Sequence, residues 1–137
     1  MGGKDKNMRI LLAEDDFLTR NFISGFLSKY GDCDITVDGM EAVDAFMMAL
    51  EEGEPYDLVC LDIMMPVMDG YQALMGIRNL EKERDIPEEK AAKIIMTTAL
   101  NEEKNVKMAF DLGCTVYSGK PIDQDKFEQI LKKFGLA

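Results

Sequence analysis

The sequence predicts an α/β domain in which a parallel sheet lies between two layers of helices. Short apolar runs alternate with segments whose apolar residues recur every three or four positions, and this alternation occurs five times in 137 residues. The predicted strands are continuous apolar runs, which is typical of parallel strands covered on both faces. We therefore expect five parallel strands joined by right-handed helical crossovers. Residues 1–7 are expected to be a flexible N-terminal segment, and residues 8–137 the domain.

The first strand is predicted at Met8–Ala13, the run MRILLA, which ends on Glu14, Asp15 and Asp16. Asp16 is better placed to cap the next helix than to bind a metal. That helix is predicted from apolar residues that share one face at 100° per residue, namely Leu18, Phe22, Ile23, Phe26, Leu27 and Tyr30. Phe17 falls on the opposite face, and Gly31 is expected to end the helix.

The second strand is predicted at Cys33–Val37, followed by Asp38 and Glu41 in a capping-box spacing. Its helix carries apolar residues at i, i+3, i+4 and i+7, namely Val43, Phe46, Met47 and Leu50. Tyr56–Asp62 is the third predicted strand and the most continuously apolar one. Asp69 can cap the third helix, which runs to about Arg84.

The charged stretch Glu81–Lys93 is predicted to be a solvated helix end and loop, too short to divide two domains. The fourth strand is predicted at Lys93–Ala99, and Asn101 is expected to cap a helix that ends at Gly113. The run CTVYSGKP, Cys114–Pro121, predicts the fifth strand and its exit. A final helix is predicted after a cap at Asp123, with an apolar face of Phe127, Ile130, Leu131 and Phe134.

Composition narrows the function. The net charge of −10, from 16 basic and 26 acidic residues, argues against nucleic acid as a partner. The longest apolar runs are too short to insert into a membrane, and the N-terminus lacks the apolar region of a signal peptide. Three widely separated cysteines, with no C-x-x-C pair, favour free thiols and a cytoplasmic location. Histidine is absent, so chemistry must use carboxylates, hydroxyls, lysine or the backbone.

Polar residues follow four of the five predicted strands. Ligands of parallel α/β sheets bind beyond the carboxyl ends of the strands. The polar residues at these ends are Glu14 and Asp15, Asp62, Thr97 and Thr98, and Lys120 followed by Pro121. Converging carboxylates suit a hard cation such as Mg²⁺. The set predicts a carboxylate nucleophile, Asp62, that attacks phosphorus and forms an aspartyl phosphate, with the metal and Lys120 neutralising charge.

Taken singly, each of these residues has an ordinary alternative. Asp62 could be a helix cap or a loop acid, Lys120 a surface lysine, and either Thr97 or Thr98 a packing residue because the two point to opposite faces. It is the joint order of acid pair, acid, hydroxyl and lysine-proline at four strand ends that favours the phosphoryl-transfer hypothesis.

The sequence resembles the receiver domains of two-component response regulators. The motifs are LLAEDD, LDIMMPVMDG, MTTA and YSGKP, and the resemblance covers about Met8 to Phe134. It is closest in form to single-domain, chemotaxis-regulator-like members. The resemblance implies a flavodoxin-like, doubly wound, five-stranded parallel sheet of strand order 2-1-3-4-5 with five helices.

The resemblance also implies a role for each residue at the phosphorylation site. Asp62 would be the phosphoacceptor. Asp15 would bind Mg²⁺ directly and Glu14 mostly through water, while Met64 would supply a backbone carbonyl to the metal.

The resemblance further implies that a second group of residues responds to phosphorylation. Thr98 would move to the phosphoryl group and Tyr117 would turn inward with it. Lys120 would pair with phosphoryl oxygens, and the bond to Pro121 is expected to be cis. Phosphorylation would shift a population between two states.

By the same resemblance, the chain is a signalling switch rather than an enzyme, catalysing only its own phosphoryl transfer and slow self-dephosphorylation. Because it has no histidine, the phosphoryl group must come from a separate histidine kinase, a histidine phosphotransfer protein or a small acyl phosphate. The output would be a downstream target protein. An alternative is a receiver from a hybrid histidine kinase or a larger regulator in a phosphorelay, although we expect no output domain after the last predicted helix.

Two further predictions concern particular side chains. Met64 and Leu100 stand where the family's members influence dephosphorylation, and apolar residues there should hinder an attacking water. Phe17, beside the acidic pair, is either an aromatic covered by a loop or a contact for the phosphoryl donor.

Three other classes of protein share part of this pattern. A haloacid-dehalogenase-type phosphatase needs a second acid at the position of Met64 and usually a cap domain. A flavin-binding protein needs a hydroxyl- and glycine-rich loop after the first strand, where this chain is acidic. A phosphorylation-independent adaptor remains open, but such a protein need not keep the full set of site residues.

Overall fold

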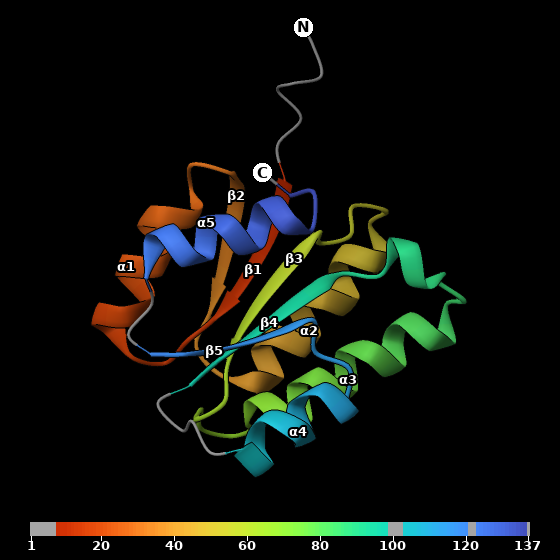
Figure 1. Cartoon of the computed structure of the whole chain (residues 1–137). Helices are drawn as coiled ribbons and strands as arrows, with labels where there is room; N and C mark the ends of the chain where they lie inside the picture. The colour runs from red at the N-terminus through yellow and green to blue at the C-terminus, as the bar shows by residue number, and fades with distance from the viewer. Residues whose placement is uncertain (1–7, 99–102, 121–122, 137) are drawn as a thin grey trace, which may run out of the picture.

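The predicted fold class and strand order are confirmed. The computed structural model describes residues 8–98, 103–120 and 123–136. Their strands form one parallel sheet of order β2-β1-β3-β4-β5 (Figure 1). The strands are β1 (Met8–Ala13), β2 (Gly31–Thr36), β3 (Leu58–Asp62), β4 (Lys93–Thr98) and β5 (Val116–Gly119). The helices are α1 (Phe17–Leu27), α2 (Gly39–Glu51), α3 (Gly70–Glu83), α4 (Glu103–Asp111) and α5 (Gln124–Lys133), with a short 3₁₀ turn at Glu88–Lys90.

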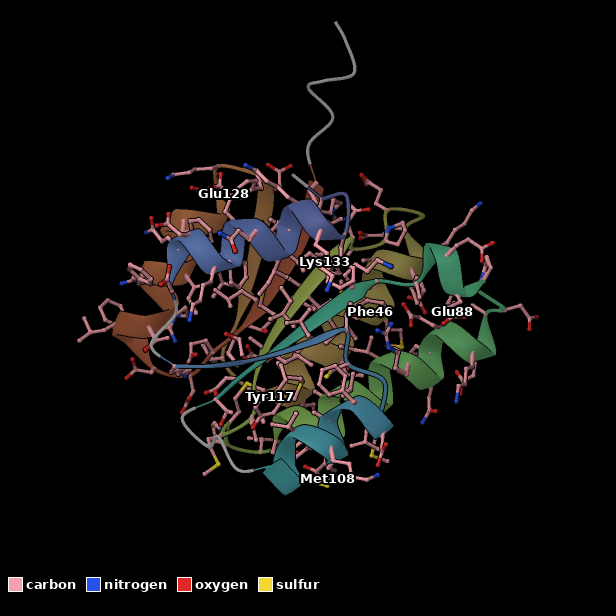
Figure 2. The ribbon with its side chains drawn as sticks, viewed as in Figure 1. Phe46, Glu88, Met108, Tyr117, Glu128 and Lys133 are labelled. Carbon is pink, nitrogen blue, oxygen red and sulfur yellow. The ribbon has the colours of Figure 1, made fainter. Side chains whose placement is uncertain are left out.

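Two apolar layers hold the sheet between its helices. Helices α1 and α5 cover one face, and α2, α3 and α4 cover the other (Figure 1). Successive residues of β1 alternate between the layers, with Ile10 and Leu12 toward α1 and α5, and Leu11 and Ala13 toward α2. The Phe46 side chain of α2 is buried in the second layer (Figure 2). Because β1, β3 and β4 are covered on both faces, their carboxyl ends are fixed in position.

The first helix differs from its prediction. It ends at Leu27, and Gly31 begins β2 rather than ending the helix. A side chain at Gly31 would collide with the backbone of Met8, the residue it pairs with in β1. The predicted apolar face was also wrong in part, because Leu18 is 76% exposed and Phe22 47% exposed. Only Ile23, Phe26 and Leu27 of α1 are buried against the sheet, and the remaining apolar residues of the helix face outward.

The bounds of three strands differ from their predictions. β2 runs from Gly31 to Thr36 rather than from Cys33 to Val37, β3 begins at Leu58 and β5 covers only Val116–Gly119. The end of the fourth predicted strand at Ala99 and the predicted cap Asn101 lie outside the described residues, as do residues 1–7.

Aspartate caps begin four of the helices, as the sequence predicts. Asp16, Asp38, Asp69 and Asp123 each accept a hydrogen bond from a backbone N–H in the first turn. Asp69 forms a full capping box with Gln72. At α2 the box is displaced, because the Glu41 carboxylate accepts from the N–H of Val37 instead of that of Asp38.

The stretch predicted to be solvated, Glu81–Lys93, begins with a buried acid in the last turn of α3. Glu81 is 5% exposed, pairs with Arg78 at 2.7 Å and accepts a hydrogen bond from the N–H of Ala92. Arg78 in turn donates to the carbonyls of Ala92 and Gly113, each at 2.9 Å. We call this set the Arg78–Glu81 brace. It ties α3 to the start of β4 and to the end of α4, at the edge of the sheet opposite the strands' carboxyl ends.

Candidate functional site

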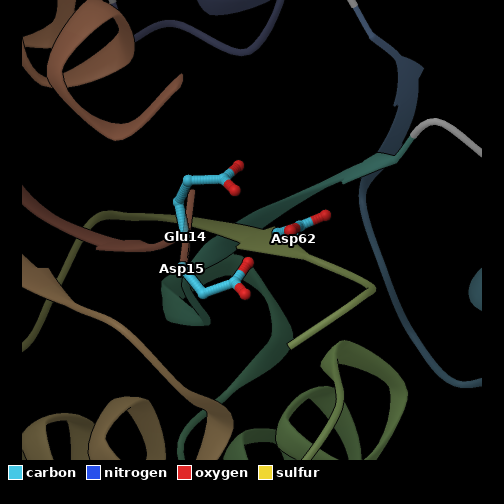
Figure 3. Close-up of side chains that lie close together, drawn as sticks. All are labelled: Glu14, Asp15 and Asp62. Atoms are coloured by element: carbon cyan, nitrogen blue, oxygen red, sulfur yellow. The ribbon is translucent and has the colours of Figure 1, made fainter. Parts of the chain in front are cut away.

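Three carboxylates meet at the carboxyl edge of the sheet. Glu14 and Asp15 directly follow β1, and Asp62 ends the neighbouring β3. One carboxylate oxygen from each lies within 4.8 Å of the others (Figure 3). Glu14 and Asp62 are buried, whereas Asp15 is exposed. The predicted convergence of these acids is therefore present, with one member open to solvent.

The backbone around Asp62 is held on two sides. The next residue, Ile63, donates its N–H to the carbonyl of Thr97 at 3.1 Å and accepts from the N–H of Gly70 at 2.9 Å. A side chain at Gly70 would lie 2.8 Å from Cα of Ile63 and would collide with the Asp62 carbonyl. Only glycine therefore lets α3 begin this close to the end of β3, and the two elements fix the position of Asp62.

Lys120 brings a positive charge to the buried acids. Its ammonium nitrogen lies 2.8 Å from Glu14 Oε1 and 3.3 Å from Asp62 Oδ1. The N–H of Lys120 donates to the carbonyl of Thr98 at 2.8 Å, so the lysine continues the pairing of β4 with β5. The fifth strand thus delivers the cation to the same place as the carboxylates.

The charges of Glu14, Asp62 and Lys120 change the pKa values of Asp62 and Lys120. Burial, the Glu14 charge and a hydrogen bond with Glu14 raise the pKa of Asp62 to about 7, although Lys120 partly opposes them. Burial acts to lower the pKa of Lys120, but its hydrogen bonds and charge interactions with Glu14 and Asp62 outweigh burial and raise it. Close to neutral pH, therefore, the metal-free site holds less negative charge than three free carboxylates would.

The donor set fits a hard divalent cation. All three groups offer carboxylate oxygens, and Asp15 leaves one side open to water. Mg²⁺ binds such sites through a few carboxylates while keeping several waters. A cation would also relieve the repulsion that raises the pKa of Asp62. The acidic cluster can therefore hold Mg²⁺.

Sequence reasoning missed one residue beside the acidic pair. The Arg20 guanidinium donates to the backbone carbonyls of Glu14 at 3.1 Å and Asp15 at 3.3 Å. It also lies 5.5 Å from the centroid of the Phe17 ring. Arg20 follows the acidic pair by about one turn of helix, a spacing that could have suggested this contact. It stabilises the turn that presents Glu14 and Asp15.

The residues expected to respond to phosphorylation, Thr98 and Tyr117, lie on β4 and β5. Thr98 is fully buried at the end of β4, and Tyr117 is half-buried on β5. Tyr117 forms a hydrogen bond with Tyr71 of α3, a partner that the sequence did not indicate. Thr97 is buried on the other face, with Oγ1 3.5 Å from the Leu61 carbonyl. Thr97 is thus the packing member of the threonine pair.

The remaining predicted residues differ in accessibility. Met64 and Phe17 are each 61% exposed, so none of the loops that the structure describes covers the Phe17 ring. Leu100 and Pro121 lie outside the described residues. Among the helices that the structure describes, none has the length and apolarity to cross a bilayer.

Comparison with known proteins decides the family. A family model described as "Response regulator receiver domain" matches residues 10–132. The chain belongs to the response regulator receiver domain family. It is 35% identical over 120 residues to the chemotaxis protein CheY of Treponema pallidum, covering 86% of this chain and 76% of CheY. It is 29% identical over 132 residues to the two-component response regulator ORR41 of Oryza sativa subsp. japonica, covering 96% of this chain and 98% of that protein.

Other relatives are much longer. The hybrid signal transduction histidine kinase L of Dictyostelium discoideum is 31% identical over 128 residues, which are 93% of this chain and 7% of the kinase. The chain spans 11% of the length of the osmosensing kinase SLN1 of Saccharomyces cerevisiae and 54% of the probable regulator ycf29 of Porphyra purpurea. Receiver domains thus occur among its relatives both as nearly whole proteins and as small parts of kinases.

Solved receiver structures have the same fold. The complex of CheX, CheY, BeF₃ and magnesium from Borrelia burgdorferi matches with a TM-score of 0.80 and 28% identity, over 96% of this chain and 94% of that one. The complex of the Saccharomyces cerevisiae phosphotransfer protein Ypd1 with the receiver domain of Ssk1 matches with a TM-score of 0.80 and 25% identity, over 94% and 89% of the two chains.

Proposed function

We propose that the chain is a phosphorylation-controlled receiver that accepts a phosphoryl group on Asp62 from a phosphohistidine of another protein, with Mg²⁺ as cofactor. The observation that carries this function is the buried Asp62 carboxylate within 4.8 Å of two further acids and 3.3 Å from Lys120. It is a receiver-type signalling switch rather than an enzyme that turns over a separate substrate.

The transfer follows from the positions of these groups. The Asp62 carboxylate attacks phosphorus, the new O–P bond forms as the P–N bond to the donor imidazole breaks, and the electron pair of that bond stays on the imidazole nitrogen. Glu14, Asp15, Asp62 and the Met64 carbonyl would hold Mg²⁺, which neutralises charge on the phosphoryl oxygens when bound. Lys120 is close enough to Asp62 to pair with one of these oxygens.

Phosphorylation adds about 1.5 to 2 negative charges at one point and so favours a state in which hydroxyl and ammonium groups face the phosphate. Thr98 and Lys120 are the groups placed to respond, since both lie where β4 and β5 end. Tyr117 lies on β5, which ends directly before Lys120, and would follow Thr98, while the cis bond at Pro121 is an expectation. The surface of α4, β5 and α5 would then control the downstream target.

The donor is a separate histidine kinase or a histidine phosphotransfer protein. Ypd1 in complex with the Ssk1 receiver is an example of the latter type of partner in a related structure. The exposed apolar residues Phe17, Leu18 and Phe22 lie on α1, the helix that follows the acidic pair in the chain, and are the candidate contact for the donor. Three free cysteines accord with a cytoplasmic location, as a kinase partner requires.

Substitution of Phe17 tests this contact. Phe17→Ala should slow phosphoryl transfer from a phosphorylated donor protein about tenfold while labelling by acetyl phosphate stays normal. Phe110→Ala, which removes an exposed phenylalanine from α4 instead, serves as the control. Equal transfer rates for both variants would rule out Phe17 as a donor contact.

A second arrangement is supported by the longer relatives. Because the chain matches only 7% of the Dictyostelium kinase, the same domain can be part of a hybrid histidine kinase or larger regulator in a phosphorelay. In that arrangement Asp62 would pass its phosphoryl group on to a phosphotransfer histidine. Incubation of the phosphorylated domain with a phosphotransfer protein distinguishes a relay, in which label moves to histidine, from a terminal switch, in which it does not.

Mass spectrometry after incubation with acetyl phosphate and Mg²⁺ tests the central proposal. The wild-type protein should gain one phosphoryl group, and Asp62→Asn should not. Asp38→Asn is a matched control, because Asp38 also follows a strand at this edge and asparagine can still cap α2. A wild-type protein that gains no mass, or an Asp62→Asn variant that does, would refute phosphorylation at Asp62 and favour a phosphorylation-independent adaptor.

A further inference from the structure

A hydrogen bond between two tyrosines joins α3 to β5. The hydroxyl groups of Tyr71 and Tyr117 are hydrogen-bonded to each other, and both rings pack against the apolar layer under α2, α3 and α4. Tyr56 belongs to the same layer, but its hydroxyl donates to Asp34 instead. The Tyr71–Tyr117 bond is long-range in sequence and crosses the region where the proposed switch operates.

One end of this bond is attached to the phosphoacceptor strand. Tyr71 is the second residue of α3, directly after Gly70, whose N–H bonds to Ile63 and whose missing side chain allows contact with the end of β3. The capping box of Asp69 and Gln72 fixes the same turn. The backbone of Tyr71 is therefore held in a fixed position relative to the backbone of Asp62.

The other end lies on the strand that delivers Lys120. Tyr117 is opposite Met96 of β4, and Thr98 is two residues further along β4, so Tyr117 and Thr98 are on the same face of the sheet. β5 is the edge strand, and Tyr117 lies on its side toward α4 (Figure 2). Because α3 packs on β3 and β4 lies between β3 and β5, the Tyr117 side chain points inward from the sheet edge to reach Tyr71.

We propose that Tyr71 is a positioning residue of the switch, whose hydroxyl holds Tyr117 in the inward orientation on the Thr98 face. This inference rests on the proposed function, in which the inward orientation accompanies phosphorylation. By linkage, a contact that favours the inward orientation must also tighten binding of the phosphoryl group or its analogue. A neutral hydrogen bond of this kind is worth about two- to tenfold in an equilibrium constant.

The substitution Tyr71→Phe tests this role with the removal of one oxygen atom. Beryllium fluoride with Mg²⁺ is the probe, and its dissociation constant is measured by amide NMR titration. Tyr71→Phe should weaken binding about two- to tenfold. Tyr30→Phe is the matched control, because it removes a hydroxyl that contacts Glu128 on the other side of the sheet, and it should bind as the wild type does.

A double-mutant cycle shows whether the effect passes through Tyr117. In a Tyr117→Phe background, adding Tyr71→Phe should change the dissociation constant no further, because the bond is already lost. A wild-type dissociation constant in Tyr71→Phe, or an equal weakening by Tyr71→Phe with and without the Tyr117 hydroxyl, would overturn the proposal.

A second readout does not depend on phosphorylation. In the metal-free protein, the aromatic ring resonances of Tyr117 should shift in Tyr71→Phe and stay unchanged in Tyr30→Phe. Failure of wild-type protein to bind the probe or to accept a phosphoryl group would refute the proposed function and, with it, the switch role of Tyr71. Normal wild-type binding with unshifted Tyr117 resonances in Tyr71→Phe would refute the positioning role alone.

Discussion

The ammonium nitrogen of Lys120 lies 2.8 Å from Oε1 of the fully buried Glu14. A buried carboxylate needs such a partner, because burial without one costs several kcal/mol. Lys120 also reaches Asp62, so in the metal-free protein a single ammonium group pairs with two carboxylates. This sharing makes the stability of the domain depend on the same residues that carry its proposed chemistry.

Removal of the Lys120 charge should destabilise the metal-free protein. Lys120→Met leaves Glu14 and Asp62 without their cation, and we expect a loss of about 2 kcal/mol in the free energy of unfolding. Urea unfolding at pH 7.5 with EDTA measures it. Lys107→Met, which breaks an exposed pair with Asp111, should cost less than about 0.5 kcal/mol. Equal losses in the two variants would contradict the role given to Lys120.

The raised pKa of Asp62 predicts how stability changes with pH. Between its unfolded value of 3.8 and its folded value of about 7, the folded protein holds a proton on Asp62 that the unfolded chain has lost. Raising the pH through this window therefore lowers the stability of the metal-free protein, by about 2–4 kcal/mol from this group.

Asp62→Asn isolates this contribution. Asparagine carries no charge, so the variant should be more stable than the wild type at pH 8 in EDTA, and the difference should shrink toward pH 4. Saturating Mg²⁺ should reduce the difference at pH 8, because the cation stabilises the ionised wild-type site. Parallel pH profiles for the two proteins would show that the pKa of Asp62 is not raised.

The close approach at Gly70 predicts a steric defect. Gly70→Ala puts a methyl group against the backbone of Asp62 and Ile63, and backbone atoms cannot rotate away as a side chain would. We expect a loss of about 2 kcal/mol or more in stability, together with weaker Mg²⁺ binding because Asp62 moves. Gly25→Ala is the control, since its added methyl contacts nothing within 4 Å, and it should stabilise α1 by about 0.5–1 kcal/mol.

The exposed Met64 predicts a long-lived phosphoryl group. Its apolar side chain, two residues after Asp62, offers no hydrogen bond to orient an attacking water. Met64→Asn should speed the loss of the phosphoryl group about tenfold, the effect of ~1.4 kcal/mol on a barrier. Decay of the phosphorylated mass measures the rate, with Met75→Asn on the exposed side of α3 as control. An unchanged decay rate in Met64→Asn would refute this shielding.

The sequence predicted the parts of the molecule that depend on local pattern. The strand order was implied by the family motifs, whereas the converging strand ends followed from the apolar runs and from the rule that parallel strands end at one edge. The aspartate caps are equally local, because each needs only a backbone N–H two or three residues away. For this reason Glu14, Asp15, Asp62 and Lys120 could be placed together before any coordinates were known.

Contacts between distant segments could not be predicted in the same way. Glu81 looks like one more acid in a charged run, and only the fold brings Ala92 and Arg78 around it. The Tyr71–Tyr117 bond likewise depends on how far α3 lies from β5. On α1, periodicity predicted an apolar face wider than the sheet can cover, so Leu18 and Phe22 were placed on that face although their side chains are exposed.

The Arg78–Glu81 brace holds the C-terminal end of α4 in place. Arg78 holds the carbonyl of Gly113, two residues after α4 ends, so a rearrangement of the helix leaves that end in place. The nine residues of α4 span about 13 Å at 1.5 Å per residue, and a rotation of ~10° about the fixed end moves the other end by ~2 Å. A small angular change is thus enough to alter the surface that a partner contacts, without any loss of packing at the braced end.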